Sequence, residues 1–247
     1  SFDVPRGEIL AVAGVQGNGQ TELAEVILGL RTPDSGAIRL EDTDITRAKP
    51  RESLDAGVGF IPEDRSTDGI IASFSIADNL VLDQFRSSSF SAAGSLKRGA
   101  IARNARDKEK EYDIRLTSIE DPVSSLSGGN QQKVVVAREM SRDLTLLVAN
   151  QPTRGVDVGS IEFIHRRIVD VRDQGCAVLL ISSELDEVVS LADRIAVMYR
   201  GRIVGIVPAD TGRDVLGLMM AGVPLDEAVE ASSGSAGDAG APRKEEQ

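Results

Sequence analysis

The apolar positions of this chain fall into two kinds of pattern. Three short and almost continuous apolar runs cover residues 8–13, 144–149 and 177–181. Such runs are typical of strands that are buried on both faces of a mostly parallel sheet. Longer stretches at 22–30 and 134–142 are predicted to be helices. The alternation of buried strands with helices predicts an α/β fold.

A further helix is predicted after residue 160. Its apolar face is formed by Ile161, Ile164, Ile168 and Val171. Ser160 precedes this face and is the expected N-cap, because a serine hydroxyl can accept a hydrogen bond from a free backbone N–H. His165, the only histidine of the protein, falls at the edge of the apolar face. We expect it to be a structural residue.

The last quarter of the chain predicts two helices and a strand pair. The helices are expected at 184–192 and 213–220, and the strands at 195–199 and 203–207, joined by a short turn. Residues 224–247 become rich in serine, glycine, alanine and charge, without periodicity. This segment is expected to be a disordered tail.

Composition narrows the class of protein. With 247 residues, of which 41% are hydrophobic, the chain can bury a large core. The net charge of −11 argues against a nucleic-acid-binding surface, which needs clustered Lys and Arg. The single cysteine, Cys176, lies in an apolar run and is expected to be a reduced core residue. The apolar runs are far shorter than the ~20 residues that span a bilayer. Residues 1–5 read as the middle of a strand and its turn, so we expect a fragment of a longer polypeptide.

A glycine-rich loop follows the first predicted strand and opens the first helix. Strand, loop and helix N-terminus together can hold a phosphate through backbone N–H groups and the helix dipole. The spacing matches the P-loop pattern, except that Gln20 stands where the motif has lysine. A dinucleotide fingerprint is disfavoured, because it needs a third small residue where Glu22 stands. The candidate nucleotide-binding residues are Gly14, Gly17, Asn18, Gly19, Gln20, Thr21 and Glu22.

A second glycine turn lies at residues 126–133, with the sequence Leu-Ser-Gly-Gly-Asn-Gln-Gln-Lys. Two glycines let the backbone approach an anion, Ser127 adds a hydroxyl, and a helix follows. The three residues from Ser127 to Gly129 alone are far more typical of an ordinary glycine turn that caps a helix. The eight-residue string resembles the signature motif of ABC-type ATPases, and its ending resembles that of simple-sugar and nucleoside importers.

The resemblance extends over about 223 residues and implies a fold and its parts. It implies a P-loop, RecA-like ABC ATPase core with a small antiparallel β arm and an α-helical arm. The β arm is expected within 36–60, with short strand-like segments at 37–40 and 58–61. The single domain would cover 1–223: the P-loop core and β arm at 1–76, the helical arm with the signature at 77–135, and the rest of the core at 136–223.

Five positions depart from the family pattern, and in the family each of them does chemistry. Gln20 replaces lysine and Glu63 replaces the glutamine that touches the attacking water and magnesium. Asn150 and Gln151 replace two carboxylates, and Ser183 replaces the switch histidine. For Glu63, an exposed acidic turn is an equally good interpretation of the spacing.

The resemblance implies a function and partners. The chain looks like the second ATPase half of a tandem simple-sugar or nucleoside importer, with ATP and Mg²⁺ as cofactors and Thr21 and Asn150 near the metal. Its own site, with the degenerate catalytic positions Glu63, Gln151 and Ser183, is expected to be impaired. Ser127 and Gly129 are expected to act in trans on the partner's nucleotide.

The expected partners are the other ATPase half in a head-to-tail pair, membrane permease subunits and, indirectly, a solute-binding protein. The chain would then be cytoplasmic and peripheral on the inner face of the membrane. The loop at 154–157 resembles the segment by which two such domains communicate. The alternative is a soluble ABC-type ATPase that does not transport. Proteins of that class are expected to keep both sites functional, so the five departures argue against it.

Overall fold

A six-stranded sheet forms the centre of the computed structural model, which describes residues 1–235. The strand order is β10-β9-β1-β8-β7-β4, and every neighbouring pair is parallel except β10 with β9. The strands are β1 (Ile9–Ala13), β4 (Val58–Ile61), β7 (Leu146–Asn150), β8 (Ala177–Ser182), β9 (Arg194–Tyr199) and β10 (Arg202–Pro208). The buried parallel strands and the antiparallel pair predicted from the sequence are confirmed.

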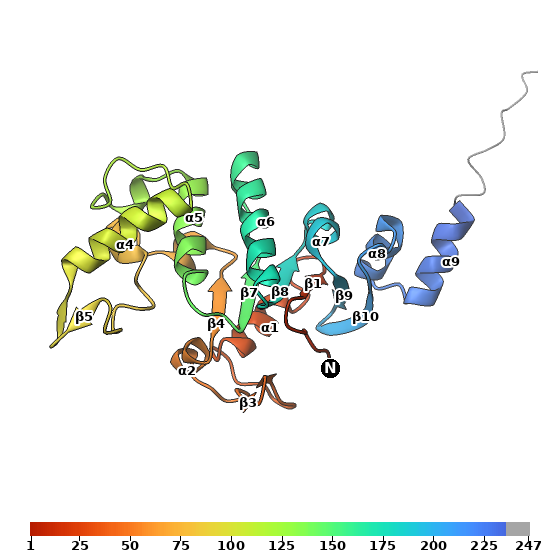
Figure 1. Ribbon diagram of the computed structural model, residues 1–247. Helices are drawn as coiled ribbons and strands as arrows, with labels where there is room; N and C mark the ends of the chain where they lie inside the picture. The colour runs from red at the N-terminus through yellow and green to blue at the C-terminus, as the bar shows by residue number, and fades with distance from the viewer. Residues whose placement is uncertain (236–247) are drawn as a thin grey trace, which may run out of the picture.

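Helices cover both faces of this sheet (Figure 1). Ile9, Ala11 and Ala13 of β1 pack on the face that carries α5, α6 and α7, whereas Leu10 and Val12 pack on the face that carries α1. Since neither face of β1 meets water, an uninterrupted apolar run is the pattern that this position requires. The helices of the core are α1 (Gln20–Ile27), α5 (Gly128–Glu139), α6 (Val158–Asp173), α7 (Leu185–Leu191) and α8 (Arg213–Met220).

The longest of the described helices, α6, has 16 residues. No helix within residues 1–235 has both the length and the apolar character needed to cross a bilayer.

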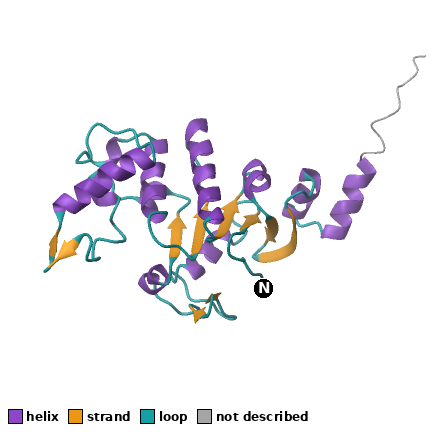
Figure 2. Ribbon diagram, viewed as in Figure 1, coloured by secondary structure: helices purple, strands orange, loops and turns teal. Residues whose placement is uncertain are grey.

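Two smaller arms extend from the core, as Figure 2 shows by secondary structure. The β arm contains the antiparallel pair β2 (Arg39–Leu40) and β3 (Thr43–Asp44), followed by α2 (Pro50–Asp55). The helical arm contains η1 (Arg65–Gly69), α3 (Ile76–Asn79), β5 (Ser91–Ala92), β6 (Ser95–Leu96), α4 (Arg98–Glu111) and η2 (Val123–Ser125).

One strand expected in the β arm belongs to the core instead. Val58–Ile61 is β4, which pairs in parallel with β7 at the edge of the main sheet. Val58 packs into the hydrophobic cluster on one face and Ile61 into the cluster on the other. An arm strand with one solvated face could not bury both side chains.

The C-terminal expectation also needs correction. Residues 225–235, expected to be disordered, form the helix α9 (Leu225–Ser235), which packs against α8. Ala228 is completely buried there, and Asp226 and Glu227 lie in the first turn, where acidic side chains interact favourably with the helix dipole. Residues 236–247 of the expected tail lie outside the described residues.

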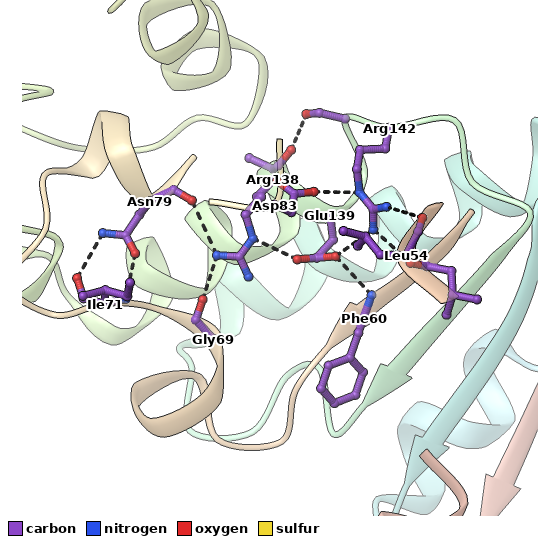
Figure 3. Close-up of polar contacts among 12 residues, drawn as sticks. Leu54, Phe60, Gly69, Ile71, Asn79, Asp83, Arg138, Glu139 and Arg142 are labelled. Carbon is purple, nitrogen blue, oxygen red and sulfur yellow. Dashed lines mark hydrogen bonds and ion pairs between the residues drawn. The ribbon is translucent and has the colours of Figure 1, made fainter. Parts of the chain in front are cut away.

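A buried ionic cluster joins the core to the helical arm, and it is composed of Asp83, Arg138, Glu139 and Arg142 (Figure 3). Arg138 Nε donates to Glu139 Oε1 at 2.8 Å, and its Nη1 donates to the carbonyl oxygen of Gly69 at 2.8 Å. Arg142 forms ion pairs with Glu139 at 3.2 Å and with Asp83 at 2.7 Å. Burial, and after it the nearby Glu139 carboxylate, raise the pKa of Asp83. Through these contacts α5 and the residues directly after it are fixed to the helical arm at Gly69 and Asp83.

Cys176 is buried, and this burial raises the pKa of its thiol to about 11. Because the thiolate is the reactive form, we expect the native protein to resist labelling by an aromatic disulfide reagent at pH 8. The same reagent should titrate one thiol when the chain is unfolded in guanidinium chloride. Rapid stoichiometric labelling of the native protein would contradict the buried position.

Candidate functional site

The loop between β1 and α1 is shaped by its glycines. Gly17 and Gly19 have φ angles of 87° and 107°, in the left-handed region that glycine adopts without strain. Gly19 is the N-cap of α1, so the helix begins at Gln20, two residues earlier than expected. The N-terminus of α1 therefore lies directly after the loop. The positive end of the helix dipole is at the predicted phosphate cradle.

Gln20 is bonded into the loop that it follows. The residue is 7% exposed, its Oε1 accepts a hydrogen bond from the backbone N–H of Asn18 at 3.0 Å, and its Nε2 donates to the carbonyl oxygen of Val15 at 3.1 Å. The Asn18 side chain in turn accepts from the N–H of Arg200 at 2.8 Å. The neutral amide of Gln20 thus stabilises the conformation of the loop. It also occupies the Asn18 N–H, which is one of the backbone donors of the predicted phosphate cradle.

A cavity of about 740 Å³ lies beside this loop. It contains three of the expected catalytic positions, namely Glu63, Gln151 and Ser183, together with Gln16 of the loop. Gln151 Nε2 donates to Ser183 Oγ at 3.1 Å, and Gln16 Nε2 donates to Glu63 Oε1 at 2.8 Å. The carboxyl ends of four neighbouring parallel strands, β1, β8, β7 and β4, lie at this edge of the sheet, which is why residues from distant parts of the sequence converge.

The backbone of Gln151 is strained at this point. Its φ angle is 49°, in a region that costs a residue other than glycine on the order of 1–3 kcal/mol. The backbone N–H of Gln151 donates to the carbonyl oxygen of Ile181 at 2.8 Å, which helps to hold this conformation. Such strain is typical of functional positions. In this conformation the Gln151 side chain is hydrogen-bonded to Ser183.

The two residues expected near a metal offer only neutral oxygen atoms. Thr21 is exposed in the first turn of α1, and Asn150 is buried at the end of β7. Within residues 1–235 there is no group of three or more His, Cys, Asp or Glu side chains that could hold a metal ion. Magnesium prefers carboxylate, phosphate and water ligands, so these residues fit it only when a nucleotide phosphate supplies further oxygens.

The wall of the cavity contains a polar chain that the sequence did not reveal. Glu187 Oε1 accepts from Thr153 Oγ1 at 2.7 Å and lies 2.9 Å from His165 Nε2. The Glu187 side chain is buried, so these two contacts tie α6 and the loop after β7 to α7. His165 therefore has the structural environment that the sequence led us to expect. In the sequence, Glu187 gave no signal beyond that of an acidic residue in a first helical turn.

The second glycine turn is the N-terminus of α5. Ser127 is exposed and is the N-cap, with its Oγ accepting from Asn130 Nδ2 at 3.0 Å. Because α5 begins at Gly128, the residues from Asn130 to Lys133 belong to the helix rather than to a loop before it. Lys133 Nζ binds the Asp113 carboxylate at 2.9 Å.

Gly129 lies directly against the start of α6. A methyl group at Gly129 would overlap Ser160 Oγ and Asp157 Oδ2. Asp157, not Ser160 as expected, is the N-cap of α6, and its carboxylate accepts from the Ser160 N–H at 3.1 Å and from Ser160 Oγ at 2.8 Å. The Ser160 hydroxyl bond, followed by the backbone bond, lowers the pKa of Asp157. Neither Ser127 nor Gly129 is among the residues that line the cavity, so the two glycine turns of this chain form separate elements.

Comparisons with known proteins agree with this arrangement. A family model described as "ABC transporter" matches residues 1–154. The chain is 47% identical over 228 residues to the nucleoside import ATP-binding protein NupA of Lactococcus lactis subsp. cremoris, covering 92% of this chain and 45% of that protein. It is 46% identical over 233 residues to the guanosine import ATP-binding protein NupO of Bacillus subtilis, covering 94% and 46%. The chain thus spans about half the length of these curated relatives.

The fold is also found among solved structures. A dimeric bacterial ABC transporter cassette superposes with a TM-score of 0.71 at 19% identity, covering 85% of this chain and 89% of that one. A nucleotide-free ATP-binding cassette from an ABC transporter superposes with a TM-score of 0.70 at 21% identity, covering 94% and 90%. The matches to the family model and to the curated relatives show that this chain belongs to the ABC transporter family.

Proposed function

We propose that this chain is one ATP-binding half of an ABC importer for simple sugars or nucleosides, and that its signature turn completes the nucleotide site of the other half. The names of the relatives, which include a glucose importer component of Haloferax volcanii at 46% identity, favour import over a transport-independent ATPase. The chain's share of these relatives, 40–46%, is what one half of a tandem protein would cover.

In this proposal the chain works in an assembly. Its partner is the other ATPase half in a head-to-tail pair, and both are bound to permease subunits at the cytoplasmic face of the membrane. A solute-binding protein delivers the substrate to the permease from the other side. The cofactors are ATP and Mg²⁺.

The observation that carries the proposal is the environment of Gln20. A neutral amide, bonded to Asn18 and Val15, stands where a cation would contact the nucleotide phosphates. A charge-assisted hydrogen bond to phosphate contributes about 1.5–3 kcal/mol, so its loss should weaken ATP binding by about ten- to a hundredfold. The N-terminus of α1 and the loop N–H groups still favour a phosphate, with Thr21 beside it. The chain therefore binds nucleotide weakly in its own site.

The chemistry of the cavity points the same way. Gln151 and Ser183 are hydrogen-bonded to each other, and neither is charged. Gln151 can hold a water molecule, but an amide cannot accept its proton, and the loss of a positioned general base costs roughly 10²–10⁴ in rate. Glu63, the one carboxylate among the three expected catalytic positions, is bonded to the Arg154 guanidinium.

Ser127 and Gly129, in contrast, keep the features that a phosphate site needs. Ser127 is exposed at the N-terminus of a 12-residue helix, and its hydroxyl proton remains available to a ligand because its oxygen acts as the acceptor towards Asn130. In the proposed pair this turn faces the γ-phosphate of the nucleotide bound to the other half.

We expect the purified chain to release phosphate from ATP with Mg²⁺ at a rate far below that of a typical enzyme, because its own site lacks both the cation and the base. Added permease and partner half, assayed as the complete transporter in lipid, should restore hydrolysis. Turnover of roughly 1 s⁻¹ or faster by the chain alone would contradict the proposal and favour an independent ATPase.

A further inference from the structure

We propose that Arg65 is a positioning residue for the signature turn Ser127–Gly129, an inference that rests on the proposed function. Arg65 is the first residue of η1, a single π-helical turn that begins two residues after Glu63. Its guanidinium lies between the signature turn and the loop after β7, and it contacts both. Arg65 thereby connects three segments, which carry the expected site residues Glu63, Ser127 and Gln151.

The position of Arg65 is fixed from both ends. At the backbone, the Asp64 carboxylate caps η1 by accepting from the N–H groups of Ser66 at 2.8 Å and Thr67 at 3.3 Å. At the tip, Arg65 Nη1 donates to the carbonyl oxygen of Arg154 at 3.0 Å, and Nη2 donates to that of Gly155 at 3.3 Å. Two parallel bonds from one planar group restrict its orientation in a way that a single donor would not.

The connection to the loop after β7 runs in both directions. The Arg154 side chain is ion-paired with Glu63, while the Arg154 carbonyl accepts from Arg65. The segment 63–65 and the loop at 154–155 are therefore joined by two side chains, Arg65 from the segment and Arg154 from the loop. Gly155 has a φ angle of 66°, which turns its carbonyl group within reach of the guanidinium.

The signature turn packs on this connection at Gly128. A Cβ atom there would lie 3.3 Å from Arg65 Cζ, would overlap Nη2 and would lie 3.5 Å from the Gly155 carbonyl oxygen. The absence of a side chain lets the guanidinium contact the backbone of the turn directly. Gly129 is confined in the same way by Asp157 and Ser160, so the turn is held between Arg65 on one side and the start of α6 on the other.

Arg65 restricts the movement of the signature turn. Without the Arg65 side chain, the turn loses its contact at Gly128 and can move into the space that the guanidinium occupies. Displacement of a positioned catalytic group by about 1 Å can cost on the order of a hundredfold in rate. Because the signature turn is proposed to act on the partner's nucleotide in the transition state, the loss should appear in kcat for ATP rather than in KM.

The test is a double-mutant cycle in the complete transporter, with its permease and both ATPase halves. We expect Arg65→Ala to lower kcat about ten- to a hundredfold with KM for ATP little changed. Arg65→Lys should recover little, because an ammonium group cannot form both carbonyl bonds in the same geometry. In a Ser127→Ala background, Arg65→Ala should cause almost no additional loss, because both changes disable the same turn. Arg65→Met keeps the aliphatic stem and replaces Arg65→Ala if that variant folds poorly.

Arg6→Ala is the matched control. Arg6 likewise donates to a backbone carbonyl group, that of Gly175 at 3.2 Å, and to the Glu41 carboxylate at 2.7 Å, but it is exposed and lies outside the cavity and the signature turn. A kcat within about twofold of wild type for both Arg65→Ala and Arg65→Met, or a double variant whose loss is the product of the two single losses, would overturn the inference alone. If Ser127→Ala leaves hydrolysis unchanged, the proposed function itself fails and this inference fails with it.

Discussion

Replacing Ser127 with arginine is expected to abolish ATP hydrolysis by the complete transporter. Ser127 is the exposed N-cap of α5, and in the proposed pair its hydroxyl and the following N–H groups face the γ-phosphate held by the other half. Removing one preorganised donor typically costs on the order of 10²–10³ in rate. Arginine also fills the space of the phosphate, so the loss should be at least this large. The measurement is phosphate release by the full tandem protein with its permease.

The expected effect is asymmetric between the two turns of this chain. Gln20→Ala changes the loop of the nucleotide site proposed for this chain. The Gln20 amide carries no charge that could contact a phosphate, and it already bonds to Asn18 and Val15. The complete transporter carrying Gln20→Ala should keep most of its activity. Equal damage by Gln20→Ala and Ser127→Arg would mean that this half binds and uses its own nucleotide.

The second large effect is on stability. Arg138→Ala is expected to lower the free energy of unfolding by about 3–5 kcal/mol, because it leaves the buried Glu139 carboxylate without one of its two cations and the Gly69 carbonyl group without its donor. The Arg138 and Glu139 side chains are only 8% and 7% exposed, so water cannot replace the lost bonds. Urea unfolding of the purified chain, followed by circular dichroism, measures this change.

Arg98→Ala is the control for this prediction. Arg98 forms an ion pair with Asp78 at 2.6 Å, but its side chain is 68% exposed, and an exposed pair contributes about 0–1 kcal/mol. A loss of less than about 1 kcal/mol for Arg138→Ala, similar to that of Arg98→Ala, would show that the cluster of Asp83, Arg138, Glu139 and Arg142 does not stabilise the join between core and arm.

Local patterns in the sequence were sufficient for the elements whose environment is uniform. The strands β1, β7 and β8 are buried on both faces, so their continuous apolar runs identified them. The glycine-rich loop before α1 was recognisable because its backbone needs left-handed φ angles at Gly17 and Gly19. The signals failed where a short segment has its environment set by distant neighbours. Val58–Ile61 was assigned to the arm because nothing nearby shows that β7 lies beside it.

The sequence by itself thus determined the fold class and the family, because both depend on residue type at a fixed spacing. Only the tertiary structure decided what Gln20, Gln151, Ser183 and Arg65 touch. The bond between Gln151 and Ser183 joins residues that are 32 positions apart, and the bonds from Arg65 to the loop after β7 join residues that are 89 and 90 apart. Such contacts form only when parallel strands and their loops meet at one edge of the sheet. The strand order that brings them together cannot be predicted from any short segment of the sequence, because it depends on contacts between distant segments.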